Sequence, residues 1–252
     1  KAKVFAAEIE ERNQIRKELD QKITKEALEM IDPNKKSTVV FGSNWHKGVV
    51  GIVASRLIET CYKPTIVFAE NNGVFTGSGR SVHDFDLYDA VVKCSHFCEK
   101  FGGHKYAVGL SIKKKNIKGF IDAFETVVSE KITEDQLSPK IEVDMQIDIN
   151  DINEKLFRII KQFSPFGPFN LSPVFMSQSV VDNGYGKILG NDRSHLRINI
   201  KKYSGSIAGI GFGMSNYYDK IKDNQEFDIC YSIVENEWNG RKKLQLILSD
   251  IK

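Results

Sequence analysis

The spacing of apolar residues changes near residue 133, and this change restricts the fold more than any other feature of the sequence. Before that point, short β-branched runs alternate with longer segments of helical spacing, whereas strand-like segments dominate beyond it. The polar stretch TEDQLSPK (133–140) separates the two patterns. With 252 residues, the chain is long enough for two domains of ordinary size. We therefore expect an α/β domain followed by a β domain.

The first pattern predicts a long helix and then a mixed sheet covered by helices. The long helix spans 5–31 and ends at Pro33 and Asn34, so that residues 1–36 form a connecting helix. The sequence NNG joins two strand-like runs, which is a hairpin signal. Residues 37–132 then form the α/β domain, with strands near 37–42, 64–70, 73–81 and 107–112 and helices near 48–62, 86–101 and 117–132.

Residues 141–252 predict mainly strands around one helix at 152–163. The dipeptides Asn183-Gly184 and Asn239-Gly240 favour tight hairpins. About five strands with one helix are typical of an OB-type barrel, and a β-sandwich is the alternative. The expected fold class is therefore α/β plus β: a long helix, a mixed-sheet α/β domain and an OB-type β-barrel.

Composition excludes some classes without identifying a partner. Hydrophobic residues make up 41% of the chain and charged residues 27%, as in soluble globular proteins. No apolar run approaches the roughly 20 residues that cross a bilayer, and the first residues lack the apolar core of a secretory signal. We expect a cytoplasmic protein without a membrane partner. The net charge of +3 is too small to indicate nucleic acid by itself.

The sequence CSHFC places Cys94 and Cys98 four residues apart, with His96 between them. A metal site would explain this spacing, but apolar neighbours favour a buried helical stripe of reduced thiols. The chain also lacks an H-E-x-x-H run, an Asp-His-His run, a nucleophile elbow and paired carboxylates. We expect no metal ligands and no catalytic residues in this chain, which by its residues alone binds phosphate without cutting it.

The sequence TGSGRS (76–81) is the first candidate phosphate site. Alternating glycines remove side chains from one face of a strand and let a ligand or another backbone approach. Ser78 and Ser81 offer hydroxyls, and the guanidinium of Arg80 matches two phosphate oxygens at once. A bulged strand with a solvated arginine is the structural alternative.

The sequence FGGHKYAVG (101–109) is the second candidate. Gly102 and Gly103 can present bare N–H groups in a turn, and His104 can donate to a phosphate or carry a proton. The alternative is a glycine-rich helix stop with a structural histidine.

Two weaker candidates precede these motifs. His46 lies just before a predicted helix, whose N-terminus attracts anions, although a packed loop would look similar. Asn13 and Arg16 share one face of the long helix, where most such pairs are simply solvated.

Basic and aromatic residues are interleaved in the β domain. Charge for the backbone and rings for stacking are what a single-strand groove uses, although lysines also protect exposed strands from pairing. The residues concerned are Tyr185, Lys187, His195, Arg197, Lys201, Lys202, Tyr203, Trp238, Arg241 and Lys242.

Taken together, NWHKGVVGIVASRL, GSGRS and FGGHKYAVGLSI resemble, in this order and spacing, the RecJ-type single-strand-specific DNA exonucleases of the DHH phosphoesterase superfamily. The glycine-histidine turn is similar to the signature of the DHH-associated domain. The likeness extends back to RNQIRKELDQKITKEAL, which is similar to the family's connecting helix, and forward to HLRI, AGIGF and NEWNGRKKLQLILSDI, which resemble its OB domain.

The resemblance implies that a DHH domain carrying Mn²⁺ or Mg²⁺ should precede Lys1, while this fragment binds neither metal. It implies 5′-to-3′ digestion of single-stranded DNA in recombination and repair, with Arg80, Ser81 and His104 gripping phosphates. Asn13 and Arg16 match polar positions of the connecting helix. The implied partners are single-stranded DNA and the DHH domain, with a single-strand-binding protein or a helicase as further candidates.

Two alternatives stay open. One is a non-catalytic nucleic-acid-binding or assembly module related to inactive RecJ homologues. The other is a DHH phosphodiesterase for short oligonucleotides or cyclic dinucleotides, which normally lacks the barrel expected at residues 141–252.

Overall fold

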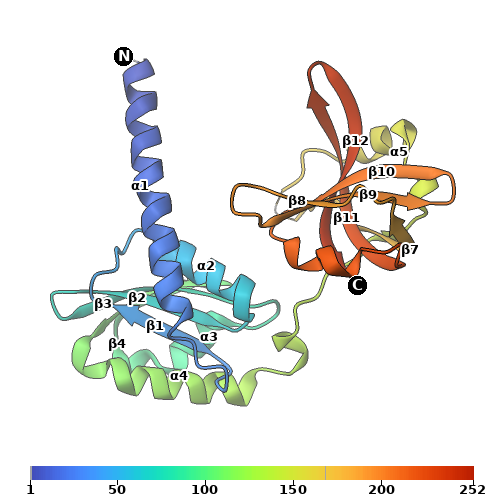
Figure 1. The fold of residues 1–252 in the computed structure, drawn as a ribbon. Coiled ribbons are helices and arrows are strands. Elements are labelled where there is room, and N and C mark those ends of the chain that lie inside the picture. Colours follow the sequence, from blue (N-terminus) through green and yellow to red (C-terminus); the bar gives the residue numbers. More distant parts are fainter. Residues whose placement is uncertain (1, 168) are drawn as a thin grey trace. The chain divides into compact units, whose positions relative to one another are not determined.

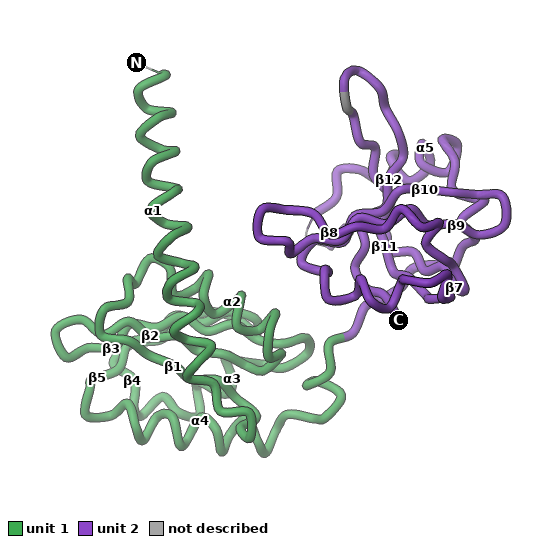
Figure 2. The backbone as a smooth tube through the Cα atoms, in the orientation of Figure 1, with its two compact units in different colours: residues 1–139 green, residues 140–252 purple. Residues whose placement is uncertain are grey.

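The computed structural model describes residues 2–167 and 169–252, with Trp238 described by its backbone alone. The chain divides into two compact units, residues 1–139 and residues 140–252 (Figure 2). Although α1 has 27 residues, neither it nor any other described helix is apolar over a length that would cross a membrane.

The first unit is a mixed five-stranded sheet with helices on both faces (Figure 1). Its strands lie in the order β1-β2-β3-β5-β4; β1 and β2 are parallel, and all other neighbours are antiparallel. Its helices and strands are α1 (Ala2–Leu28), β1 (Thr38–Gly42), α2 (Val50–Cys61), β2 (Thr65–Asn71), β3 (Val74–Arg80), α3 (Leu87–Lys93), β4 (Cys98–His104), β5 (Ala107–Lys113) and α4 (Ile117–Lys131).

Alternation along β2 separates two hydrophobic cores. Ile66 and Phe68 point to the face covered by α3 and α4, where the Phe68 and Phe120 rings meet at 5.9 Å. Val67 and Ala69 point to the face covered by α1 and α2. Because both faces are covered, residues 65–69 are buried throughout.

The C-terminal half of α1 packs on the unit, and its N-terminal half stands clear of the sheet (Figure 1). Asp20 is buried and accepts a hydrogen bond from Arg56 at 2.7 Å, and Glu26 accepts one from the Trp45 indole at 2.8 Å. The helix therefore matches the predicted 5–31 except that it begins and ends three residues earlier.

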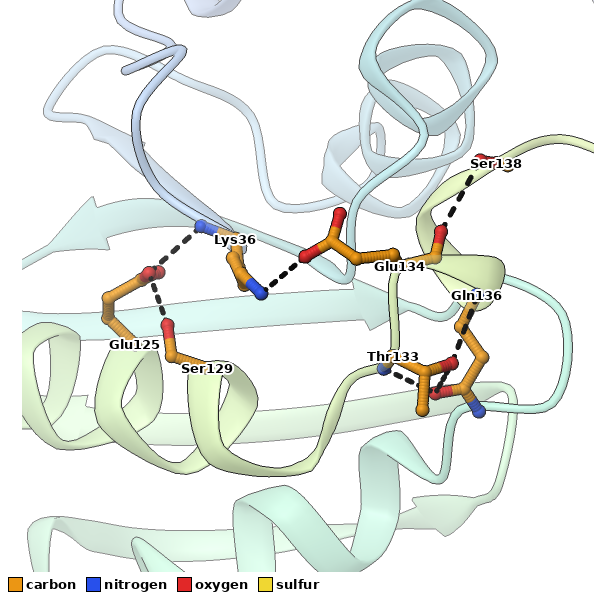
Figure 3. A network of polar contacts seen from close by, with 7 residues as sticks. All are labelled: Lys36, Glu125, Ser129, Thr133, Glu134, Gln136 and Ser138. Carbon is orange, nitrogen blue, oxygen red and sulfur yellow. Dashed lines mark hydrogen bonds and ion pairs between the residues drawn. The ribbon is translucent and has the colours of Figure 1, made fainter.

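A polar network joins the start of β1 to the end of α4 (Figure 3). The Glu125 carboxylate accepts hydrogen bonds from the backbone N–H groups of Lys36 and Ser37 and from the hydroxyls of Ser37 and Ser129. Burial opposes ionisation of Glu125, but these hydrogen bonds outweigh it and hold its pKa below the ordinary value. The Lys36 ammonium also pairs with Glu134 at 2.8 Å.

One predicted helix is wrong in its second half. The segment 86–101 was expected to be helical, but α3 ends at Lys93, and β4 begins at Cys98 and pairs with β5. The cause is the partner strand β5, whose pairing with this segment overrides the helical spacing of its apolar side chains. Cys94 and Cys98 therefore do not share a helical stripe.

The second unit is a closed barrel of OB topology. Strands β7, β9, β10, β12 and β11 pair in that order, and β11 pairs back to β7; β10 and β12 are the parallel pair. Its strands and helix are β6 (Met145–Gln146), α5 (Glu154–Gln162), β7 (Phe175–Asp182), β8 (Lys187–Leu189), β9 (His195–Lys202), β10 (Gly205–Gly211), β11 (Phe227–Trp238) and β12 (Arg241–Ile251).

One of the two predicted hairpins is present. Asn239 and Gly240 both have positive φ and connect the paired strands β11 and β12. Asn183-Gly184 is instead part of a loop, because β7 and β8 both pair with β9 and not with each other. The Asp182 carboxylate holds this loop by accepting the N–H groups of Gly184 and Gly186.

Candidate nucleic-acid interface

The two glycines of TGSGRS, Gly77 and Gly79, lie against side chains of the hydrophobic core. A Cβ at Gly77 would lie 2.4 Å from the Phe68 ring, and one at Gly79 would lie 2.7 Å from Val108. Both glycines thus face the core beneath α3 and α4, and the expectation that they open the strand to a ligand is wrong. Ser78 and Arg80 alternate with them and point to the other face of the sheet.

Arg80 lies against the first turn of α2. Its Nη1 donates to the Ser78 hydroxyl (3.1 Å) and to the Gly79 carbonyl (2.8 Å), while its Nη2 lies 3.1 Å from the Cβ position of Gly51. Among the described residues, neither Nη2 nor Nε of Arg80 has a partner. No side chain caps α2 at Val49, so a guanidinium and an uncapped helix N-terminus meet at one place. Two positive groups side by side favour an anion between them.

The strand register brings His104 onto the same face. Arg80 pairs with Ala107 of β5, and Ala107 pairs with His104 of β4, so the three form one row. Neighbouring strands are about 4.8 Å apart, which places the backbones of Arg80 and His104 about 10 Å from each other. The His104 Nδ1 accepts the Tyr106 N–H at 3.3 Å, which leaves the exposed Nε2 as the donor of the neutral ring.

Gly102 and Gly109 form a surface without side chains beside this row, which we call the floor. Ser78 pairs with Gly109, and Gly109 pairs with Gly102, so the next row is a serine followed by two glycines. A Cβ at Gly102 or Gly109 would meet nothing within 4 Å. A phosphate backbone can therefore approach the main chain beside the row of Arg80 and His104.

Gly102 and Gly103 are not part of a turn, contrary to expectation. Both belong to β4, and the hairpin turn is Lys105-Tyr106. Gly103 has φ +149°, and a Cβ there would lie 2.2 Å from the Ala107 carbonyl oxygen. Gly103 is therefore required by the hairpin itself, whereas Gly102 leaves space free.

The other predicted residues have different surroundings. The Ser81 hydroxyl donates to the Phe85 carbonyl at 2.7 Å, which commits its proton to the local loop. His46 is exposed and lines a cavity of about 510 Å³ together with Thr76, which shares the β3 face of Ser78 and Arg80. This cavity therefore borders the candidate interface.

Asn13 and Arg16 of α1 hydrogen-bond to each other at 2.9 Å, with Asn13 exposed and Arg16 half-buried. No described contact joins them to the sheet residues. Their part in binding DNA stays a prediction.

Sequence reasoning missed Lys100 and Thr76, which occupy the same face. Thr76 pairs with Ser111, and Ser111 pairs with Lys100, which adds a third row to the interface. The missed signal was the period of two: Lys100, Gly102 and His104 alternate with core-facing positions once residues 98–104 are recognised as a strand.

The cysteines do not form a metal site. Burial raises the pKa of Cys94 to about 11. Burial, and to a lesser extent the charge of the neighbouring Cys94 thiolate, raises the pKa of Cys98 to about 11. Both side chains are therefore protonated thiols near neutral pH. Within residues 2–167 and 169–252, no three His, Cys, Asp or Glu side chains gather as metal ligands would. These residues therefore do not fit a bound metal ion.

The barrel gathers some of its predicted basic residues. Arg197 and Lys242 line a groove of about 750 Å³, and Arg197, Lys187 and Tyr185 line an adjoining one of about 310 Å³. Lys201, Lys202 and Tyr203 line a separate cavity of about 500 Å³. The side chain of Trp238 lies outside the described part of the chain.

Comparison with known proteins agrees with this architecture. The DHHA1 domain family matches residues 3–130, and the RecJ OB domain family matches residues 143–250. The family matches and the observed fold therefore agree on the class of protein: an α/β domain of the DHHA1 type followed by an OB barrel. The chain belongs to the RecJ family of the DHH superfamily.

Individual relatives cover the whole chain. It is 32% identical to the single-stranded-DNA-specific exonuclease RecJ of Bacillus subtilis over 99% of its length, and 28% identical to that of Escherichia coli over 99%. The chain spans 32% and 45% of those proteins. The crystal structure of Thermus thermophilus RecJ in complex with Mn²⁺ has the same fold, with a TM-score of 0.80 over the whole chain and 36% of that protein, at 22% identity.

Proposed function

We propose that this chain is the single-stranded-DNA-binding part of a RecJ-like exonuclease that digests from 5′ to 3′ in DNA recombination and repair. The relatives that cover the chain are named as single-stranded-DNA-specific exonucleases. The observation that carries the proposal is the shared sheet face of Arg80, Ser78 and His104 beside a floor of two glycines.

In this function the three parts of the face have separate roles. Arg80 and the first turn of α2 hold one phosphate through charge-assisted hydrogen bonds. Gly102 and Gly109 let the strand lie against the backbone, and the Nε2–H of His104 donates to a neighbouring phosphate. These contacts position the strand without reading its sequence.

Hydrolysis belongs to the rest of the enzyme in this proposal. Mn²⁺ or Mg²⁺ activates water and stabilises charge in phosphodiester cleavage, and the described residues here do not fit such an ion. We expect the chain to bind single-stranded DNA and not to degrade it by itself. Degradation by pure protein would contradict this division of roles.

The test measures affinity for a fluorescent single-stranded oligonucleotide by anisotropy. We expect Arg80→Ala and His104→Ala to weaken binding, the first about tenfold because it removes a bidentate charged contact. Arg80→Lys keeps the charge but loses the planar fork, so its affinity should fall between those of the parent and Arg80→Ala.

The matched control is Lys118→Ala, because Lys118 is exposed on α4 and that helix covers the opposite face of the sheet. It should bind as the parent does. Parent-like affinity of both Arg80→Ala and His104→Ala would remove this face from the function.

Salt dependence tests the same proposal independently. Phosphate contacts release counterions, so affinity should fall steeply between low and physiological salt. A flat response would indicate a protein partner instead, for which a single-strand-binding protein or a helicase is a candidate. The free cysteines fit our proposal of a cytoplasmic enzyme.

A further inference from the structure

The outer face of the barrel carries a groove of about 750 Å³ whose polar lining is rich in amides. Asn199 of β9, Asn236 of β11 and Gln245 of β12 all line it. Arg197 and Lys243 line the same groove. The groove thus combines cations for phosphates with side chains that both donate and accept hydrogen bonds.

The register places two of these amides in one row across the sheet. Asn199 of β9 pairs with Ala208 of β10. In the parallel pairing of β10 with β12, Gly209 lies opposite Leu246, so the preceding residues Ala208 and Gln245 also lie side by side. The methyl group of Ala208 therefore separates two longer amide side chains and leaves space above itself. Asn236 lies further along the same face, since Val234 pairs with Gln245 and strand residues alternate.

These three amides have no hydrogen-bond partner for their side chains among the described residues. Two other asparagines at the groove are used by the fold: the Asn150 amide donates to Asp148 at 2.5 Å, and the Asn153 carbonyl oxygen caps α5. Asn199, Asn236 and Gln245 are therefore available to a ligand, whereas Asn150 and Asn153 are not.

The lining also differs from a stacking surface. Grooves for single strands commonly hold bases on aromatic rings, but no aromatic side chain of the described residues lines this groove. Tyr185 lines the adjoining cavity, which shares Asn199 and Ala208 with the groove. Bases that lie over Asn236 and Gln245 meet no ring of the described residues, so hydrogen bonds to their edges must hold them there.

We propose that the barrel groove binds unstacked bases of a single strand through edge hydrogen bonds from Asn199, Asn236 and Gln245, while Arg197 and Lys243 contact phosphates. This inference rests on the proposed binding of single-stranded DNA and adds how the bases are held. Because an amide presents both a donor and an acceptor, it can pair with any base edge, with adenine the best match.

The test compares two oligonucleotides of equal length, one with bases and one with abasic sites at every position, at fixed salt. The parent chain should bind the strand with bases about tenfold more tightly. The triple variant Asn199→Ala, Asn236→Ala, Gln245→Ala should lose most of that preference while keeping the affinity of the parent for the abasic strand. Asn216→Ala, an exposed amide of the same unit outside the groove, is the control.

A second variant, Arg197→Ala with Lys243→Ala, should weaken both strands equally and reduce the salt dependence of binding. The inference is overturned if the triple variant discriminates between the strands as the parent does, or weakens both equally. Equal binding of both strands by the parent also overturns the inference but leaves the proposed function standing. If the parent binds neither strand, the proposed function itself fails.

Discussion

Two adjacent glycines of β4 give a sharp test of the structure, because they should respond in opposite ways to the same substitution. A Cβ at Gly103 would lie 2.2 Å from the Ala107 carbonyl oxygen and 2.7 Å from the Cα of Val108, both backbone atoms of the paired strand. A Cβ at Gly102 would meet nothing within 4 Å. Gly103→Ala should therefore disturb the hairpin, and Gly102→Ala should not.

The expected magnitudes follow from backbone conformation and overlap. Gly103 has φ +149°, a region that costs a residue with a side chain roughly 1–3 kcal/mol. The overlap with backbone atoms adds to this strain, so we expect Gly103→Ala to lower the free energy of unfolding by about 3 kcal/mol. Gly102 has no such φ, and alanine there should change stability by less than about 0.5 kcal/mol.

The assay is urea unfolding followed by the fluorescence of Trp45, which lies in the first unit. A Trp238→Phe background leaves Trp45 as the only tryptophan of a chain that has two. With a slope of about 2 kcal/mol per molar urea, Gly103→Ala should lower the midpoint by about 1.5 M. Equal midpoints for the two variants would refute the pairing of β4 with β5.

The same pair separates folding from binding. Gly102→Ala places a methyl group on the floor beside the row of Arg80 and His104, so it should weaken binding of single-stranded DNA although it folds normally. Unchanged affinity would show that the strand does not approach the backbone there.

Three further predictions test other parts of the structure. Gly51→Ala puts a Cβ 3.1 Å from Nη2 of Arg80, so anisotropy should show about fivefold weaker DNA binding. Urea unfolding should show a gain in stability of up to about 1 kcal/mol, because alanine favours the helix more than glycine does. Tighter DNA binding would contradict the placement of Arg80. Glu125→Gln should cost about 1–2 kcal/mol at pH 7. Because the pKa of Glu125 is lowered on folding, this stabilisation is present above its unfolded pKa and disappears as the pH falls through the lowered value, so the stability curves of parent and variant should converge in acid. Cys94 and Cys98, whose pKa burial raises from 9.0 to about 11, should be alkylated at pH 8 about a hundredfold more slowly than in unfolded protein, as mass spectrometry of the labelled peptides would show.

Local patterns predicted most elements because the signals act within each segment. The apolar face of α4 and the NNG hairpin were both located from sequence, and Asn72 and Gly73 have the positive φ that such a turn needs. The family resemblance implied that Arg80 and His104 both contact phosphates, and the strand register places these two residues in one row.

The failures involve contacts between distant segments. Residues 98–101 continue a helical spacing of apolar side chains, but β5 supplies a strand partner that no local window contains. The same holds for TGSGRS, where the sequence shows that one face lacks side chains but not which face meets Phe68 and Val108. Strand pairing, and not composition, decides which side of the sheet carries Arg80 and His104.

The order of residues in GGH can now be explained by the register of the hairpin. At the position opposite Val108, backbone atoms of the paired strand leave no room for a Cβ, so only glycine fits there. Gly103 occupies this position. A slip by one residue would place His104 or Gly102 at that site and turn every side chain of β4 to the other face. With His104 there, a Cβ would overlap the backbone, so this slip is blocked by sterics. Gly103 thereby excludes the register in which His104 stands opposite Val108 and points away from the face of Arg80.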